Sequence, residues 1–402
     1  MNEASSTMNQ AGMAGQSKPQ PKFHLHHTAI ASIEALKKRL HEAESSIEFE
    51  TFYFLPDAVG REILDILVDK ARKGVKIRLL CDTMGSFSIT SSMYIKELHK
   101  AGSHVKFFNT IFPFSKSAKS FWYLRNHRRT IIIDGRILFV GSLCIGEPAH
   151  NWIETMIELH HSAASDQAKA VFNKTWKKSS RRTFKIGNAS EMSTDAFSYI
   201  TQSPLQNQRH LYNLLMKKIR ESKRSIVFAT PYLVPDHRLF RTLRKAAKRG
   251  VRITFICPKA TDFYSADLAR DSFIHSLLRL KMEVYFLPFM IHSKVAIFDA
   301  DHLALQTMSP MSAEPKEAYI PRTSGAPSAL IGTLNLDNIS LRYNYECAIY
   351  TDDKECVHEL AAHMHSIINR HPETKLSEHA WLHRSVFRKI LEFLILPLRK
   401  LF

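Results

Sequence analysis

Two short segments of the 402-residue sequence place a histidine two positions before a basic residue and seven before an aspartate. They are His127–Asp134, with Arg129 as the base, and His292–Asp299, with Lys294. An apolar run follows each base, and side chains alternate along a strand, so each histidine and its base should share one face. An imidazole and a cation over one spot suit an anionic electrophile such as a phosphodiester.

The sequence around these motifs predicts the elements that must position them. Apolar periodicity alternates between helical and strand patterns from Thr28 onward, which is typical of a mixed α/β sheet covered by helices on both faces. In the first half we predict helices ending at Leu40 and over 60–73 and 93–101, with strands over 47–54, 75–81, 105–108, 129–133 and 138–140.

The pattern then starts again. The stretch 71–77, Ala-Arg-Lys-Gly-Val-Lys-Ile, returns as Ala-Lys-Arg-Gly-Val-Arg-Ile over 247–253. The offset between equivalent residues is 179 at Ser46 and Ser225, 176 at the glycines of these two stretches, and 165 at the two histidines. A slowly drifting offset indicates a duplicated domain with small differences in its loops.

The spacing between the motifs and the glycine turns, together with local composition, predicts the boundaries of the domains and an insertion in the second half. From Asp134 to the next glycine turn at Gly141 is 7 residues, but from Asp299 to Gly332 is 33, so the second half carries 33 minus 7, or 26, extra residues. So long a proline-containing loop is usually functional or disordered. We predict a disordered tail over 1–22, a first domain over 23–185, a polar linker over 186–207, a second domain over 208–372 with an insertion about 301–328, and a basic amphipathic segment over 373–402.

Charge and cysteine usage narrow the class of partner and compartment. A formal charge of +18 and a pI of about 9.6 predict an anionic partner, either a membrane surface or nucleic acid. Five scattered cysteines without metal-ligand spacing indicate buried thiols in a cytosolic protein. No run of about 18 apolar residues occurs, so we expect membrane contact to be peripheral.

The C-terminal stretch Trp381–Phe402 mixes apolar residues near helical spacing with arginines and lysines. A basic amphipathic helix of this sort can lie in an anionic interface. Packing of its apolar face onto the protein's own core remains the alternative. A second basic run, Lys174–Lys185, is more typical of a solvated helix face.

A resemblance rests on the doubled motif, each copy of which is followed by a glycine turn, Gly141–Cys144 and Gly332–Asn335. This arrangement resembles the phospholipase D superfamily. Within it, Thr230–Asp236 and Gly332–Asp337 are similar to bacterial-type cardiolipin synthases, and the likeness covers about residues 26 to 370. The chain looks like the branch that has no N-terminal transmembrane segments.

The resemblance implies two similar mixed-sheet α/β domains, related by a pseudo-twofold axis, with one active site at their interface. One histidine forms a phosphohistidine and the other serves as acid and base; by the family's pattern His127 is the nucleophile. Arg129 and Lys294 neutralise the phosphate, so no metal or other cofactor is expected, and Asp134 and Asp299 hold the imidazoles. The implied catalytic residues are His127, Arg129, Asp134, His292, Lys294 and Asp299, and the implied substrate-binding residues are Asn335, Thr333, Ser142 and Glu346. The resemblance also implies that Glu346 orients a histidine.

The implied activity is transfer of a phosphatidyl group from one phospholipid to phosphatidylglycerol. Phospholipids and an anionic membrane surface would be the partners of a cytoplasmic protein peripherally associated with the inner membrane. The first half departs from the pattern at Arg129, where Lys is expected, at Cys144, where Asn is usual, and over 152–155, a loose version of Trp-Arg-Asp-Thr. Arginine keeps the charge as a planar fork, but cysteine replaces an amide donor poorly.

Three alternatives stay open on the sequence alone. Water as acceptor gives phospholipase D hydrolysis. A nuclease could use the same chemistry, although the sequence lacks a run of aromatic residues interleaved with basic ones, so no specific nucleic acid partner is expected. The departures in the first motif also allow a catalytically weakened, lipid-binding homologue.

Overall fold

The structure is a computed structural model that describes residues 22–109, 123–179, 189, 191–193, 195–204, 208–300 and 325–401. The predicted disordered tail up to residue 21 lies outside the described residues. Part of the predicted linker and residues 301–324 of the predicted insertion also lie outside them.

The first half forms a seven-stranded mixed sheet in the order β1-β7-β6-β5-β2-β3-β4. The strands β2, β3 and β4 are parallel to one another, and β5 runs antiparallel to β2. Its elements are β1 (Phe23–Thr28), α1 (Ala29–Glu42), β2 (Ser46–Thr51), α2 (Ala58–Arg72), β3 (Lys76–Asp82), η1 (Phe87–Ile89), α3 (Met93–Lys100), β4 (His104–Phe108), β5 (Thr130–Ile133), β6 (Ile137–Gly141), η2 (Glu147–Ala149), β7 (Ile153–His160) and α4 (Ala163–Ser179).

The second half repeats this topology in a sheet of order β12-β11-β9-β13-β14-β16-β8, and β10 pairs with β15 in a separate two-stranded ladder. Its elements are β8 (Phe197–Gln202), α5 (His210–Glu221), β9 (Ser225–Ala229), β10 (Leu233–Val234), α6 (His237–Lys248), β11 (Arg252–Pro258), α7 (Tyr264–Arg279), β12 (Glu283–Leu287), β13 (Val295–Phe298), β14 (Ser328–Gly332), β15 (Leu336–Asp337), α9 (Asn338–Arg342), β16 (Glu346–Thr351), α10 (Lys354–Arg370), η3 (Pro372–Thr374), α11 (Glu378–Leu382), α12 (Val386–Ile395) and η4 (Leu396–Leu401).

The repeated sequence signals form the same local structures in both halves. Asp57 caps α2 by accepting from the backbone N–H of Gly60, and Asp236 caps α6 by accepting from that of Leu239. The glycines of the repeated stretches, Gly74 and Gly250, follow these helices with φ near 90°, a conformation that other residues rarely adopt. The duplication predicted from the drifting offset is therefore present at the level of caps and turns.

The prediction of a linker over 186–207 is wrong for its middle part. Residues 197–202 form β8, which pairs antiparallel with β16 at the edge of the second sheet. Every residue of β8 is buried, and Phe197, Tyr199 and Ile200 belong to the hydrophobic core. The polar residues on both sides of this short strand are typical of a linker, and its partner β16 lies far along the chain. The equivalent edge strand of the first half is β1, so the repeat begins at Phe23 and Phe197.

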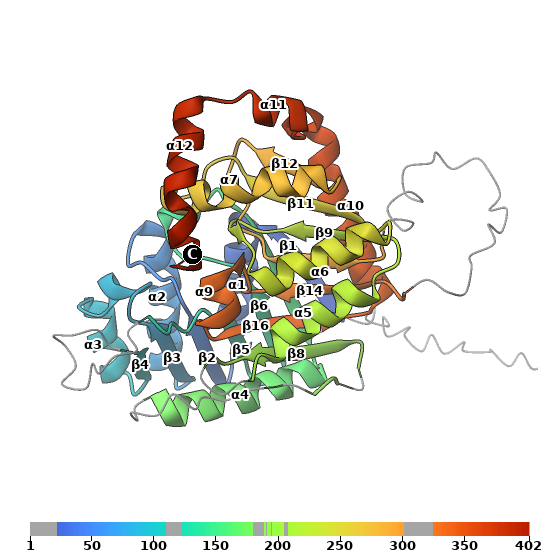
Figure 1. The fold of residues 1–402 in the computed structure, drawn as a ribbon. Helices are drawn as coiled ribbons and strands as arrows, with labels where there is room; N and C mark the ends of the chain where they lie inside the picture. Colours follow the sequence, from blue (N-terminus) through green and yellow to red (C-terminus); the bar gives the residue numbers. More distant parts are fainter. Residues whose placement is uncertain are drawn as a thin grey trace, which may run out of the picture.

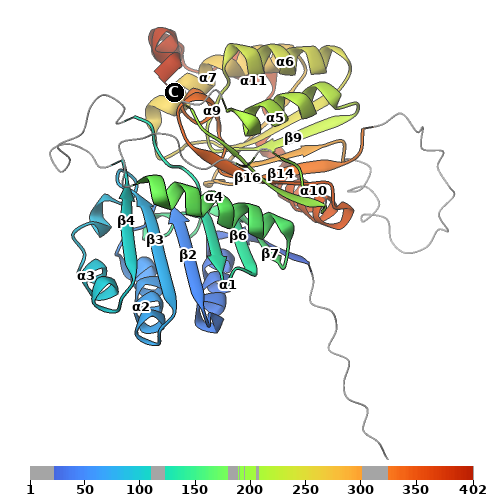
Figure 2. The same ribbon diagram turned by 90° about the horizontal axis from the view of Figure 1, so that it is seen from below.

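The inner faces of the two sheets meet in one shared hydrophobic core. Ile132, Val140 and Ile157 of the first sheet belong to the same buried cluster as Val295 and Ile331 of the second. Figure 2 shows the halves as two bodies, blue to green and yellow to red, with α4 and α10 between them. Burial of this interface fixes the two histidine-bearing strands relative to each other.

After α10 the chain forms α11 and α12, which lie against α7 at the outside of the second half (Figure 1). In the part of the chain that the structure describes, no helix combines the length and the apolar character that crossing a membrane requires.

Candidate active site

Each histidine motif is tied to a strand of the opposite half by backbone pairing. The N–H of His127 donates to the carbonyl of Tyr345 at 3.0 Å, and the N–H of His292 donates to the carbonyl of Ile153 at 2.8 Å. Isolated parallel bridges accompany both contacts. This reciprocal pairing is what a pseudo-twofold arrangement predicts, and it brings each histidine beside the residue that follows its partner, Glu346 or Glu154.

The His127 imidazole is held by the carboxylate of Glu346 from β16. Both carboxylate oxygens lie 3.0 Å from Nδ1. Glu346 is fully buried and is itself fixed by hydroxyl groups of Thr333 and Ser340, the latter 2.8 Å away. Because a carboxylate accepts the Nδ1 proton, the Nε2 lone pair of a neutral His127 faces the site.

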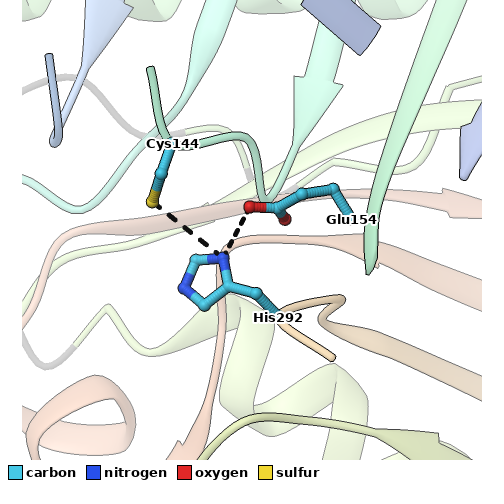
Figure 3. Close-up of side chains that lie close together, drawn as sticks. All are labelled: Cys144, Glu154 and His292. Atoms are coloured by element: carbon cyan, nitrogen blue, oxygen red, sulfur yellow. Dashed lines mark hydrogen bonds and ion pairs between the residues drawn. The ribbon is translucent and has the colours of Figure 1, made fainter. Parts of the chain in front are cut away.

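The His292 imidazole is held in the same way by Glu154 of β7, whose Oε1 lies 2.8 Å from Nδ1. Ser142 donates its hydroxyl hydrogen to this carboxylate. Figure 3 shows the ring nitrogen facing both Glu154 and the sulfur of Cys144, which is 4.0 Å away. The imidazole of each motif is thus oriented by a glutamate from the other half of the chain.

The basic residues of the two motifs lie on the opposite nitrogen of each ring. Nζ of Lys294 is 2.9 Å from Nε2 of His292, and a guanidinium nitrogen of Arg129 is 3.3 Å from Nε2 of His127. Arg129 also donates to the sulfur of Cys144 at 3.3 Å. Two buried cations and two imidazoles therefore converge, which is the charge arrangement that an anionic phosphate requires.

The two histidines differ in proton affinity. Burial lowers the pKa of His127 to about 4, Arg129 and Lys294 act in the same direction, and Glu346 opposes them. Burial also acts to lower the pKa of His292, but the charge of Glu154 outweighs it and raises that pKa above its ordinary value. His127 therefore loses its proton at lower pH than His292, and His292 is the ring that holds a proton more strongly.

The flanking groups are shifted as well. Burial, followed by the charge of Arg129, lowers the pKa of Lys294 to about 7. Burial opposes ionisation of the Cys144 thiol, yet Arg129 and His292 outweigh burial and lower its pKa. Such shifts concentrate where ionisable groups are brought together in a closed site.

A cavity of about 220 Å³ opens onto His127 at the junction of the two halves. Its apolar walls come from both halves and include Phe52, Met84, Val234 and Phe263, and Asn335 projects a polar side chain into it. Among the described residues, Oδ1 of Asn335 has no hydrogen-bond partner although the side chain is buried. The cavity is also lined by polar residues, namely Arg125, Tyr232, Asp337, Ser340 and Asn344. Its mainly apolar wall suits a lipid more than a highly charged polymer.

Among the described residues, one group of three could offer ligands to a metal. Atoms of Cys144, Glu154 and His292 lie within 4.8 Å of one another. Their neighbours argue against a cation, because Arg129 contacts the sulfur and Lys294 contacts the His292 ring. The charge balance of the site suits an anion instead.

The expectation that Asp134 and Asp299 hold the imidazoles is wrong. Each lies at the far end of its strand, seven residues or about 20 Å from its histidine. Asp134 accepts backbone N–H groups from 44–46, the closest at 2.7 Å, and Asp299 accepts those of 223–225 in the same way. Both adopt positive φ, 53° and 57°. They cap the turn that precedes the neighbouring strand.

The predicted substrate-binding residues separate into two groups. Ser142, Thr333 and Glu346 are fully buried, and the two hydroxyls hold the glutamates that orient the histidines. Glu346 orients His127, as the resemblance implies, and contact of these three residues with substrate stays a prediction. Of the four, only Asn335 lines the cavity among the described residues.

Sequence reasoning missed Glu154. The signal was present in the repeat, because Glu154 and Glu346 are 192 residues apart and the glycines Gly141 and Gly332 are 191 apart. Residues 152–155 match the family's Trp-Arg-Asp-Thr pattern only loosely, so the carboxylate of Glu154 was not assigned a role.

A family model described as "Cardiolipin synthase, PLD-like domain" matches residues 36–176 and 215–368. The chain belongs to this family. The matched ranges coincide with the two halves of the fold, and the expected phospholipase D-like architecture is confirmed.

Individual cardiolipin synthases are similar to this chain at low sequence identity. The probable cardiolipin synthase of Bacillus subtilis is 28% identical over 351 residues, covering 81% of this chain and 62% of the relative. The cardiolipin synthase of Geobacillus kaustophilus is 28% identical over 336 residues, covering 80% and 61%. The chain thus spans about three-fifths of the length of these two relatives.

Solved structures show the same fold at low identity. The phosphatidylserine synthase of Haemophilus influenzae matches with a TM-score of 0.66 and 11% identity, over 94% of this chain and 93% of that one. The polyphosphate kinase of Porphyromonas gingivalis matches with a TM-score of 0.54 and 13% identity, over 84% and 46%. At these identities, the likeness to the synthase and the kinase concerns the fold alone.

Proposed function

We propose that this protein is a phosphatidyltransferase of the cardiolipin synthase type, which transfers a phosphatidyl group from one phospholipid to phosphatidylglycerol. The observation that supports it most is the pair of buried imidazoles, each oriented by a glutamate at Nδ1 and flanked by a cation at Nε2. Membership of the cardiolipin synthase family supports the choice of lipid.

In the first step, Nε2 of His127 attacks the phosphorus of the donor lipid. A nitrogen–phosphorus bond forms, the bond between phosphorus and the headgroup oxygen breaks, and His292 gives its proton to the departing alcohol. The low pKa of His127 keeps the nucleophile unprotonated, and the raised pKa of His292 keeps a proton available for the leaving group. The shifts thereby support His127 as nucleophile and His292 as acid.

In the second step, neutral His292 accepts the hydroxyl proton of phosphatidylglycerol, and the oxygen attacks phosphorus. The nitrogen–phosphorus bond breaks, His127 is regenerated and His292 is protonated again. The diester energy is conserved in the phosphohistidine, so the exchange needs no activated nucleotide. Arg129 and Lys294 neutralise the phosphate oxygens in both steps, and the Asn335 amide can donate to one of them.

The acceptor decides between transfer and hydrolysis. Water attacking the same phosphohistidine would give phospholipase D activity, and exclusion of water by the bound lipid favours transfer. The apolar walls at Phe52, Met84 and Phe263 favour acyl chains over a nucleic acid backbone. We place the protein on the cytoplasmic side of the inner membrane as a peripheral enzyme.

The phosphohistidine can be trapped with a nitrophenyl phosphodiester, whose leaving group departs without a proton. His292→Ala should then accumulate a covalent adduct, because the second step lacks its base, and peptide mass spectrometry should place the adduct on His127. His127→Ala should form none. An adduct on another residue, or turnover without one, would contradict the double displacement.

A further inference from the structure

We propose that the outward face of α12, continuous with the apolar rim of the active-site cavity, is the surface by which the protein docks on an anionic lipid layer. The inference rests on the proposed function, because it supplies the route by which a lipid would reach His127. The occupant we assign to this surface is the layer of phospholipid headgroups and upper acyl chains.

The helix α12 packs against the protein with its apolar side facing solvent. Exposed fractions are 71% for Phe393, 68% for Val386 and Phe387, 62% for Leu394 and 51% for Ile390. Its acidic residue Glu392, by contrast, is buried. Soluble surface helices usually show the reverse, and a contiguous exposed apolar face indicates an interaction surface.

Ion pairs fix the polar side of α12 to the body of the second half. The guanidinium of Arg388 contacts the buried carboxylate of Asp271 in α7, with Nε at 2.9 Å. Arg384 pairs with Glu392 and stacks on the ring of Trp381, 4.0 Å from its centroid. Rotating α12 so that its apolar face points inward would separate these ion pairs and leave buried charges without partners. The orientation with the apolar face exposed is therefore the stable one.

The apolar face of α12 continues toward the mouth of the cavity. The cavity-lining residues Phe263, Met84 and Ile339 are themselves exposed. Phe263 directly precedes α7, the helix that carries α12, and the Asn338 amide next to Ile339 donates to the carbonyl of Arg399 in η4 at 3.1 Å. The same connected elements therefore carry both the apolar ridge and the rim of the cavity that opens onto His127.

The charge around this surface matches an anionic layer. The helix α6 has no acidic residue, and its exposed positions include Arg238, Arg241, Arg244, Lys245 and Lys248. Figure 2 shows α6 on the side of the second half that faces away from the first sheet, as α7 is. The ring of Phe240 in α6 lies 6.1 Å from that of Phe273 in α7, so the basic helix adjoins the one that carries α12.

Charge also decides between a lipid layer and a second copy of the chain. A symmetric dimer through α12 would bring together two copies of a chain with a formal charge of +18, and like charges oppose association. An anionic lipid surface gains from the same cations. The apolar residues would enter the upper acyl region while the cations contact the phosphates.

The test is sedimentation of the 402-residue chain with vesicles of phosphatidylcholine, with and without phosphatidylglycerol. The parent carries His127→Ala, so binding is measured without turnover. Phe387→Glu/Phe393→Glu should weaken binding to both vesicle types by roughly tenfold to a hundredfold, and Arg241→Glu/Arg244→Glu should weaken only the anionic case. Ile30→Glu/Met93→Glu, on exposed residues of α1 and α3, is the matched control and should bind as the parent does.

Unchanged vesicle binding in Phe387→Glu/Phe393→Glu, with the parent's melting temperature, would overturn the proposal. The proposal would also be overturned if the parent is a dimer through α12. In that case Phe387→Glu/Phe393→Glu would become monomeric and still bind vesicles as the parent does. Failure of the proposed function is distinguishable, because an unmutated chain that docks through α12 yet transfers no phosphatidyl group would contradict the activity and leave the docking surface standing.

Discussion

The guanidinium of Arg129 lies 3.3 Å from the sulfur of Cys144, so the two main departures from the expected motif pattern contact each other. Arginine is longer than the lysine expected there, and its fork reaches His127 and Cys144 together. The two departures form one altered unit of the site.

A double-mutant cycle tests this coupling. Arg129→Lys alone should lower kcat/KM about tenfold or more, because the shorter ammonium leaves the sulfur without its donor. Cys144→Asn alone should also lower it, since an amide crowds the guanidinium. The double variant should lose less than the sum, with a coupling of about 0.5–2 kcal/mol. Strictly additive losses in steady-state kinetics would show that the residues act independently.

The pH profile of turnover should be bell-shaped. His127 must be neutral, so activity should rise as pH increases through about 4. His292 must be protonated and Lys294 must be charged, so activity should fall as pH rises through about 7, where Lys294 loses its charge, and through the raised pKa of His292.

Glu154→Gln should move the descending limb to lower pH, because the carboxylate that raises the pKa of His292 is gone. Glu346→Gln is the matched control. It removes the equivalent carboxylate from His127 and should move the descending limb less, because Glu346 does not act on His292 and raises the pKa of Lys294 less than Glu154 does. A descending limb that shifts in Glu346→Gln but stays fixed in Glu154→Gln would reverse the assigned roles of the histidines.

Asp134 should matter for stability and leave the chemistry unchanged. Asp134→Ala removes the acceptor for backbone N–H groups at 44–46 and should lower the free energy of unfolding by about 2–4 kcal/mol. Although burial acts to raise its pKa, these N–H groups lower it to about 2, below the unfolded value.

The contribution of ionised Asp134 is therefore present above pH 4 and is lost as pH falls toward 2. The stability difference between the unmutated chain and Asp134→Ala, measured by urea unfolding, should shrink over that range. An unchanged unfolding free energy combined with a large loss of kcat would instead return Asp134 to the catalytic machinery.

The fold could be predicted from the sequence because short local patterns repeat in the two halves. Aspartate caps and Gly74 and Gly250 recur at matching places, and they need no long-range information. The strand β8 was not predicted because its six residues lie between polar segments typical of a linker, and its partner β16 lies far along the chain.

The site was predicted only in part, for a related reason. The histidines and their bases follow from spacing along one strand. The carboxylates that orient the rings, Glu154 and Glu346, come from the opposite half, and no local pattern shows which carboxylate will cross the interface. Asp134 was preferred because it is near in sequence, although a strand carries it to the far edge of the sheet.

The most direct test of the proposed activity is mass spectrometry of the lipids formed when the purified protein is incubated with vesicles containing phosphatidylglycerol, with single-stranded and duplex DNA analysed in parallel. We predict cardiolipin and free glycerol from the unmutated chain, and none of either from His127→Ala or His292→Ala. Cardiolipin formed undiminished by either variant, or cleaved DNA with untouched lipid, would contradict the assignment.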